Sequence, residues 1–205
     1  MKVMLVNGSS RENGCTAAAL KETARALSEA GIETEFFFIG NVPMSDCLAC
    51  GQCRKIGKCI INDCVNEFVD KARECDGFIF GSPVYYAHPS GRLLTFMDRV
   101  FYSNGSVFRQ KPAACVVSAR RSGTTASMDV INKYFTISSM PVVASNYWNA
   151  VHGNTPEEVS QDKEGLMTVY NIGKNMAWLL QCIEAGKEKG VNPPENIKIG
   201  TNFIR

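Results

Sequence analysis

An apolar run at residues 3–6 is the feature that most constrains the fold of this chain. All four residues are apolar, which is typical of a strand buried on both faces of a parallel sheet. After a polar loop at residues 9–14, residues 16–30 carry apolar side chains at helical spacing and stop before Gly31, a residue that favours helix ends. The chain therefore opens with a predicted strand, loop and helix.

The same alternation continues along the chain. Further strands are predicted at residues 34–39, 77–80, 113–118 and 141–144, and further helices at residues 91–101, in a segment ending at Tyr134, and at residues 163–185. Parallel strands need right-handed crossovers that cover both faces of the sheet. The pattern predicts a single α/β domain, a flavodoxin-like doubly wound five-stranded parallel sheet of order 2-1-3-4-5.

Two loops are longer than connections need to be, which indicates that they carry function. Residues 40–64 form a cysteine-rich loop, and residues 145–161 contain aromatic side chains suited to a subunit interface. The domain is predicted to span residues 1–188, with residues 189–205 as a C-terminal tail.

Composition excludes several classes of protein. The 205 residues are 45% hydrophobic, enough for a substantial core, and the formal charge of +2 gives no field that favours a nucleic-acid or membrane partner. The sequence contains no apolar stretch of membrane-spanning length and no signal-peptide pattern. Nine cysteines are an odd number, and five crowd between Cys47 and Cys64, unlike a secreted disulfide framework. We therefore expect a cytoplasmic protein.

The loop after the first strand predicts an anion site, because ligands in such sheets bind at the carboxyl ends of the strands. Residues 8–16 have the pattern G-S-S-R-x-x-G-x-T, which combines small hydroxyl residues, the cation Arg11, and Gly14 before a helix N-terminus. The G-x-G-x-x-G and Walker motifs are absent, which favours a phosphomonoester over a dinucleotide or a nucleoside triphosphate. An ordinary capped helix is the alternative.

Together with G-S-P-V-Y-Y at residues 81–86, this loop resembles the NADPH-dependent FMN reductase family of the flavodoxin-like superfamily. The resemblance continues through residues 96–99 and 140–143. It implies that the first loop holds the FMN phosphate and that residues 83–87 lie along the isoalloxazine ring. The two tyrosines there offer apolar faces to a flavin, although core packing is their simplest alternative role.

The residues predicted to bind FMN come from three strand ends. They are Ser9, Ser10, Arg11, Asn13, Gly14, Cys15, Thr16, Pro83, Val84, Tyr85, Tyr86, Ala87, Ser118 and Arg120. Arg120 is placed to approach the flavin or the phosphate of a nicotinamide nucleotide, and a solvated basic turn is equally compatible with the sequence. No catalytic acid or base is predicted, because the cofactor carries the chemistry.

Four cysteines form the pattern C-x2-C-x2-C-x5-C, namely Cys47, Cys50, Cys53 and Cys59. This compact spacing suits a 4Fe-4S cluster better than structural zinc, which more often uses two separated C-x2-C pairs. The pattern resembles the cysteine motif of iron-sulfur flavoproteins, a branch of the same family that carries FMN and a 4Fe-4S cluster. Free or packed thiols are the alternative, and Cys64 is either a fifth ligand or a redox-active thiol.

The other cysteines have simpler predicted roles. Cys75, Cys115 and Cys182 lie in apolar strand or helix settings and are predicted to be core residues. Cys15 at a helix start is predicted to be a small packed residue rather than an activated thiol.

These observations predict an NAD(P)H-dependent flavin oxidoreductase that passes electrons through FMN, and through a 4Fe-4S cluster where one is bound, to an unknown small-molecule or protein acceptor. The alternatives are a cluster-free quinone, azo or flavin reductase and a flavodoxin-like electron carrier, although such carriers are commonly strongly acidic. The resemblance further implies a homodimer or homotetramer. Trp148 or His152 is placed to cover a flavin, and the sequence leaves their roles open.

Overall fold

The computed structural model describes residues 1–197 and 199–203 of the chain. Its strands are β1 (Lys2–Asn7), β2 (Glu33–Phe38), β3 (Gly77–Tyr85), β4 (His88–Pro89), β5 (Ala113–Ala119) and β6 (Ala150–His152). Its helices are α1 (Cys15–Glu29), α2 (Cys53–Ile56), α3 (Cys64–Ala72), α4 (Gly91–Asn104), the short 3-10 helix η1 (Gly105–Val107), α5 (Thr124–Ile137), α6 (Pro156–Val159) and α7 (Lys163–Glu188).

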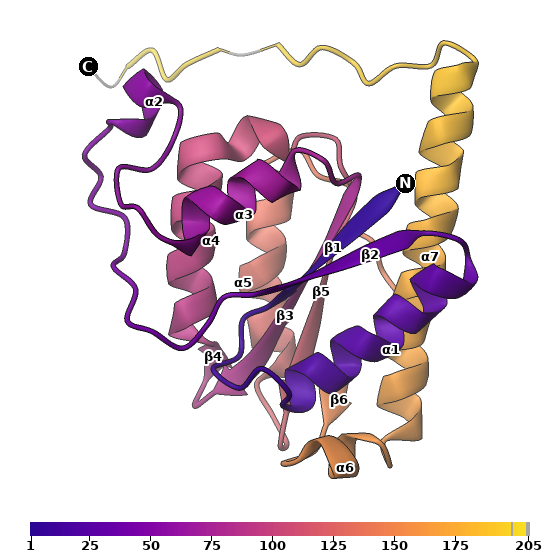
Figure 1. Cartoon of the computed structure of the whole chain (residues 1–205). Helices are drawn as coiled ribbons and strands as arrows, with labels where there is room; N and C mark the ends of the chain where they lie inside the picture. Colours follow the sequence, from indigo (N-terminus) through magenta and orange to yellow (C-terminus); the bar gives the residue numbers. More distant parts are fainter. Residues whose placement is uncertain (198, 204–205) are drawn as a thin grey trace.

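A parallel sheet of order β2-β1-β3-β5-β6 forms the centre of the molecule (Figure 1). Leu5 of β1 lies opposite Phe36 of β2 on one side and Ile79 of β3 on the other. Counted without β4, this is the predicted order 2-1-3-4-5, so the predicted fold class is confirmed. Within the described residues the sheet has six strands rather than five, because the two-residue β4 pairs with β3 in the antiparallel direction, off the main path.

Helices cover both faces of the sheet, which makes three layers (Figure 1). Helices α3, α4 and α5 pack on one face around a phenylalanine-rich core, and α1 and α7 pack on the other around an aliphatic core. Met4 and Val6 face the first core, whereas Val3 and Leu5 face the second. The first predicted strand is therefore buried on both faces, as its uniform apolar composition indicated.

The prediction of the fifth strand at residues 141–144 is wrong. That segment makes only an isolated bridge, between Val142 and Ala113, and the strand that pairs with β5 is β6. Pairing along this edge is interrupted because the chain turns away at Ser145, whose hydroxyl donates to the Tyr147 carbonyl at 2.8 Å. The predicted long loop at residues 145–161 accordingly contains β6 and α6.

The structure also differs from the sequence prediction around β3. The strand continues to Tyr85, so the G-S-P-V-Y part of the second motif belongs to the strand, and the turn begins only at Tyr86. Helix α3 was not predicted, although Val65, Phe68 and Val69 on its buried face show helical spacing. The side chain of Asp63 begins this helix by accepting a hydrogen bond from the Val65 amide at 3.1 Å.

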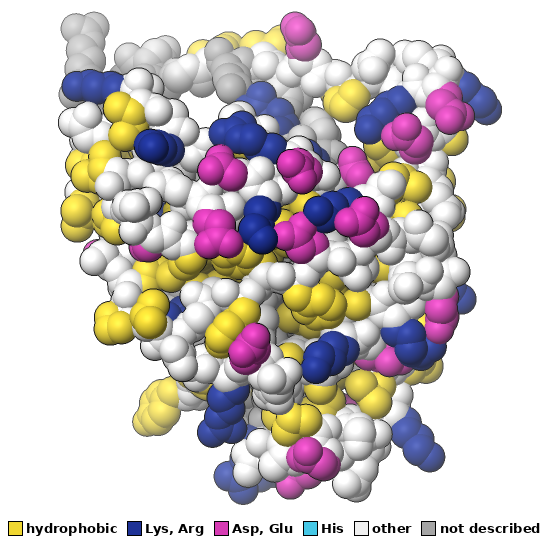
Figure 2. All heavy atoms as spheres, viewed as in Figure 1, with side chains coloured by type: hydrophobic (Ala, Val, Ile, Leu, Met, Phe, Trp, Pro, Cys, Tyr) yellow, Lys and Arg dark blue, Asp and Glu magenta, His cyan; other side chains and the backbone are white. Residues whose placement is uncertain are grey.

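Helix α7 runs three residues beyond its predicted end, and the chain after it extends away from the sheet toward the region of α2 (Figure 1). Residues 198, 204 and 205 of the predicted tail lie outside the described residues. In the described part of the chain, no helix combines the length and apolar character needed to cross a membrane. Figure 2 shows basic and acidic side chains interspersed on this face of the molecule, consistent with the small net charge.

The close contact between α1 and α7 depends on Gly173. A Cβ added there would lie 2.5 Å from the Thr23 carbonyl oxygen and 2.7 Å from the Ala26 Cβ. We expect Gly173→Ala to lower the free energy of unfolding by about 1–3 kcal/mol, because backbone and short side chains cannot give way. Urea denaturation measures this change.

Gly186 on the same helix provides the matched control. A Cβ there meets only Val191, at 3.8 Å. Gly186→Ala should be neutral or raise the free energy of unfolding by up to ~1 kcal/mol, since alanine favours helix more than glycine does. Equal effects of the two substitutions would contradict the proposed role of the Gly173 contact.

Candidate functional site

Asn7, the last residue of β1, organises the loop that follows it. Its side-chain amide donates to the carbonyl oxygens of Arg11 (3.4 Å) and Glu12 (3.0 Å), and its side-chain oxygen accepts from the Ser9 amide at 3.0 Å. The Ser9 hydroxyl in turn accepts from the Arg11 amide at 3.1 Å. An asparagine before glycine is a common sign of side-chain bonding within a turn, so Asn7 before Gly8 is the sequence signal for this role.

The loop leads into the N-terminus of α1, which is left open toward the carboxyl edge of the sheet. Its N-cap is Gly14, which makes no side-chain capping bond, and its first turn contains no acidic residue. Backbone N–H groups at such a helix start, together with the helix dipole, attract anions. Arg11 is exposed beside them. The loop therefore has the groups that would bind a terminal phosphate such as that of FMN.

One cleft contains most of the predicted flavin residues. From the first loop and the start of α1 it is lined by Ser9, Arg11, Gly14, Cys15 and Thr16. From the end of β3 it is lined by Pro83, Val84 and Tyr85, and from the end of β5 by Ser118 and Arg120. The carboxyl ends of three neighbouring strands thus meet at one opening, as expected for this topology.

A buried hydrogen bond holds two of these walls together. The Thr16 and Ser118 hydroxyl oxygens are 2.8 Å apart, which joins the first turn of α1 to the end of β5. Sequence reasoning missed Ala119, Gly153 and Asn154, which also line the cleft. The last two follow β6, so they were hidden by the wrong placement of the fifth strand.

The two tyrosines of the second motif are exposed, so they are not core residues. The Tyr85 hydroxyl lies 2.9 Å from the Ser10 hydroxyl, across the rim between two strand ends. Tyr86 is fully exposed and adopts a positive φ of 63°, a backbone conformation that costs free energy for a non-glycine residue. The Ala87 amide donates to the Tyr85 carbonyl at 2.8 Å and closes this turn.

Four predicted residues lie outside the lining of the cleft. Ser10 is on its rim, and the side chain of Asn13 accepts from the Lys21 ammonium at 3.4 Å instead of facing the opening. Tyr86 and Ala87 form the turn beyond β3. A flavin bound in the cleft would contact this turn where its ring extends past the end of β3.

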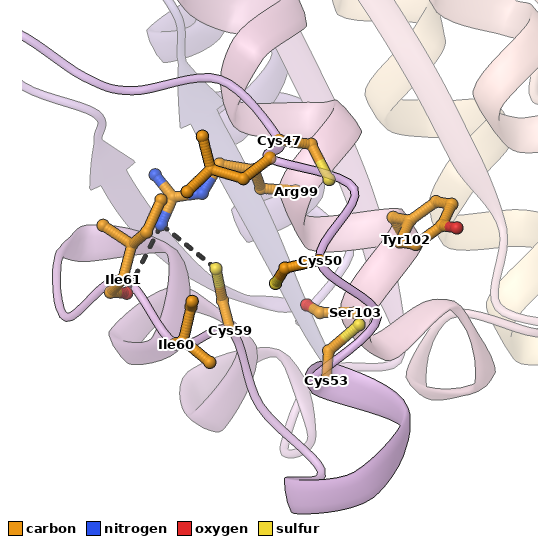
Figure 3. Close-up of a pocket in the computed structure, with 10 residues that line it drawn as sticks. Cys47, Cys50, Cys53, Cys59, Ile60, Ile61, Arg99, Tyr102 and Ser103 are labelled. Atoms are coloured by element: carbon orange, nitrogen blue, oxygen red, sulfur yellow. Dashed lines mark hydrogen bonds between the residues drawn. The ribbon is translucent and has the colours of Figure 1, made fainter.

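The four cysteines of the compact motif line a second cavity, between the cysteine-rich loop and α4 (Figure 3). The loop turns through positive φ angles at Ala49 (50°), Gly51 (68°) and Gly57 (75°), positions that a regular strand or helix would not allow. Gly57 ends α2 and directs the chain back toward Cys59. Gly57 thus lets the chain fold back within the five-residue spacer between Cys53 and Cys59.

Cys59 is fixed by two side chains from neighbouring helices. Asn66 of α3 accepts from the Cys59 amide at 3.0 Å and donates to its carbonyl oxygen at 2.9 Å. Arg99 of α4 donates from Nη2 to the Cys59 sulfur at 3.4 Å, as Figure 3 shows. Cys47 and Cys50, in contrast, are exposed on the loop.

Arg99 is a buried cation that joins three parts of the cysteine-rich loop. Its guanidinium donates to both carboxylate oxygens of Asp63, at 2.5 and 2.8 Å, and to the carbonyl oxygens of Ser45 and Ile61. Burial lowers the pKa of Arg99, but the hydrogen bonds that its guanidinium donates to Asp63 and Cys59 outweigh this effect and raise the pKa above its usual value. Sequence reasoning noted this arginine in a motif and assigned it no role.

The distribution of the four thiols around the cavity distinguishes between a single zinc ion and a 4Fe-4S cluster. Among the described residues, no three His, Cys, Asp or Glu side chains are grouped closely enough to hold a metal ion. A zinc site needs every sulfur at about 2.3 Å from one point. A 4Fe-4S cluster takes one thiolate at each of four separate irons, so ligands distributed around a cavity suit it better. The donor set, four thiols, fits the iron-sulfur group.

Cys64 lies apart from this cavity. It is the first residue of α3, and its thiol donates to the Ile39 carbonyl at 3.8 Å. Burial, and then the neighbouring Asp63 carboxylate, raise the pKa of the Cys64 thiol. Cys15 likewise is a packed thiol whose pKa burial raises.

The prediction that three cysteines are core residues is confirmed for Cys75 and Cys115 and wrong for Cys182. Cys182 is exposed because it lies on the outward face of α7. Burial raises the pKa of Cys75 to about 11 and that of Cys115 to about 12.

Trp148 lies just before β6, and His152 is the last residue of that strand; neither lines the cleft. Trp148 is 60% exposed. The His152 amide donates to the Asp162 carboxylate at 2.7 Å, and the His152 ring lies 3.6 Å from the same oxygen.

The fold and the cleft define a class of protein, a flavodoxin-like, flavin-dependent oxidoreductase that binds FMN. The family model for NADPH-dependent FMN reductases matches residues 1–155. The chain belongs to this family, as its two loop motifs predicted.

Relatives and solved structures agree with this assignment. An iron-sulfur flavoprotein of Methanocaldococcus jannaschii is 36% identical over 192 residues, covering 90% of this chain and 100% of that protein. An iron-sulfur flavoprotein of Methanosarcina thermophila is 29% identical, covering 92% of this chain and 100% of that protein. The crystal structure of RosB with the bound intermediate 8-demethyl-8-formylriboflavin-5'-phosphate superposes with a TM-score of 0.69 at 14% identity, covering 99% of this chain and 92% of RosB, which supports the fold.

The exposure of the thiols predicts their order of alkylation in the native, iron-free protein. Cys47, Cys50 and Cys182 should react with iodoacetamide first, whereas Cys115 should remain unmodified until the chain unfolds, because it is buried and the thiolate is the nucleophile. Peptide mass spectrometry over time measures this order. In urea all cysteines should react alike, and rapid native labelling of Cys115 would contradict the packing of β5.

Proposed function

We propose that this chain is an iron-sulfur flavoprotein that oxidises NAD(P)H and passes the electrons through FMN and a 4Fe-4S cluster to a small-molecule or protein acceptor. The observation that carries the proposal is the presence of both sites in one chain: an open phosphate loop in the cleft and four cysteines around one cavity. The names of the two relatives support the pairing of flavin and cluster.

The cleft residues have distinct proposed roles. The amides at the start of α1 and the Arg11 guanidinium bind the FMN phosphate, while Tyr85 and the turn at Tyr86 lie along the isoalloxazine ring. Arg120, exposed at the opposite wall, attracts the phosphates of the incoming nicotinamide nucleotide. When bound, FMN would supply the step between two-electron donors and one-electron acceptors.

In the second cavity, the proposed cluster ligands are Cys47, Cys50, Cys53 and Cys59. Ile60, Ile61 and Leu48 contribute apolar side chains to the lining of this cavity. Cys64 is excluded from the ligand set, because its thiol faces the Ile39 carbonyl on the core side of α3.

A homodimer or homotetramer is part of the proposal. The loop after β1 contacts Ser90 at the start of α4, and Arg99, further along the same helix, lines the cysteine cavity, so a rise of about 14 Å separates these two contact points within one chain. Exposed Tyr147 and Trp148 in the segment 145–161 offer an aromatic contact surface for a second copy. In this scheme residues 1–188 are the flavin-binding domain and residues 189–205 a tail.

A cluster-free FMN reductase is the second candidate, favoured by the match to the reductase family model over residues 1–155. It differs in two measurements: its visible spectrum would contain flavin bands alone, and its iron content would be near zero after anaerobic purification.

Purified protein should be yellow and should release FMN rather than FAD on denaturation. Arg11→Ala should weaken FMN retention by about tenfold or more, because it removes a charge-assisted contact to the phosphate. Fluorescence titration of the flavin-free protein measures the dissociation constant. Lys21→Ala is the control, since this exposed cation of α1, the helix that follows the loop, lies outside the cleft lining. Release of FAD alone would contradict the phosphate assignment.

Anaerobically reconstituted protein should contain about four irons and four acid-labile sulfides per chain. Cys59→Ala should lose most of this iron, whereas Cys64→Ala should retain it, because only Cys59 faces the cavity. Iron and sulfide assays measure both. Equal loss in the two variants would contradict the ligand assignment, and iron-free wild-type protein would favour the cluster-free reductase.

A further inference from the structure

The cysteine-rich loop depends on one side chain of α4 that belongs to no part of the cysteine motif. Arg99 is 1% exposed, yet it directs two nitrogens into the loop. Nη1 donates to Asp63 and to the Ser45 carbonyl, and Nη2 donates to Asp63, to the Ile61 carbonyl and to the Cys59 sulfur. Such a guanidinium holds its acceptors in fixed relative positions because its donors are coplanar.

We propose that Arg99 is a positioning residue for the fourth cluster ligand and that its hydrogen bond to the Cys59 sulfur raises the reduction potential of the cluster. The inference rests on the proposed function, because it concerns the same four cysteines.

Two physical arguments support this role. Cys59 follows a five-residue spacer, so it is the ligand whose position the C-x2-C steps fix least, and Arg99 and Asn66 fix it from two helices. Reduction adds one negative charge to the cluster and its thiolates. A nearby cation that donates to a ligand sulfur stabilises the reduced form, and hydrogen bonds to the sulfurs are among the factors that set such potentials.

The chain offers a matched pair of arginines on one helix. Arg92 also anchors the cysteine-rich loop from α4, by donating to the Val42 carbonyl at 2.6 Å, but it lies outside the lining of the cysteine cavity. Arg99→Lys keeps the charge near Asp63 and loses the planar fork that also reaches Cys59. Arg92→Lys makes the same chemical change at a loop anchor without a cysteine contact.

The test uses full-length protein reconstituted anaerobically and reduced with dithionite in an EPR-monitored redox titration. For Arg99→Lys we expect the reduction potential of the cluster to fall by at least about 59 mV, which corresponds to a tenfold change in the equilibrium constant for one-electron reduction. A ferrous-iron chelator should strip its iron about 10- to 100-fold faster than from wild type, as for other residues that support metal ligands. Arg99→Gln should shift the potential further, because it also removes the charge. Arg92→Lys should match wild type.

Urea denaturation of each variant shows whether it folds. Should Arg99→Gln fail to fold, Arg99→Lys and Arg92→Lys still decide the question. Faster iron loss in Arg99→Lys at an unchanged potential would make Arg99 a structural anchor only and would overturn the inference. Wild-type protein that takes up no iron would overturn the cluster itself, whereas a wild-type cluster that Arg99→Lys leaves unaltered would overturn the role of Arg99 alone.

Discussion

The position of β1 between β2 and β3 determines the rest of the structure. Because both its neighbours are parallel to it, each must be reached by a crossover, and its apolar side chains on both faces require helices on both sides. The same arrangement places the ends of β1, β3 and β5 at one edge. The loops that follow these strands are thereby brought together, although more than 60 residues separate the first from the second. The flavin cleft is a consequence of this parallel order.

The second site has a different physical basis, a buried charge. Moving an arginine and a carboxylate out of water costs several kcal/mol per ion, and removal of one partner from a buried pair costs about 3–5 kcal/mol. Arg99 offsets the first cost through Asp63, two carbonyl oxygens and the Cys59 sulfur. Among the described residues its Nε has no hydrogen-bond partner.

Local patterns predicted the parts of the fold that depend on local physics. The buried strand at residues 3–6 and the helix before Gly31 follow from composition and spacing within a few residues of each other, and both are present. The fifth strand was misplaced because an apolar run at residues 141–144 has the right composition, while pairing depends on which segment reaches β5 after the turn at Ser145. The cysteine spacing identified the second cavity. Arg99 was not identified as part of it, since 36 residues separate it from Asp63 and only the tertiary fold joins them.

Helix α4 links the two sites mechanically. At its start, the Ser90 hydroxyl caps the helix and donates to the Gly8 carbonyl in the phosphate loop at 2.7 Å. Nearer its end, Arg99 and Tyr102 contact the cysteine cavity. A rigid helix that contacts the loop after β1 at its start and lines the cysteine cavity further along therefore fixes the two candidate sites relative to each other.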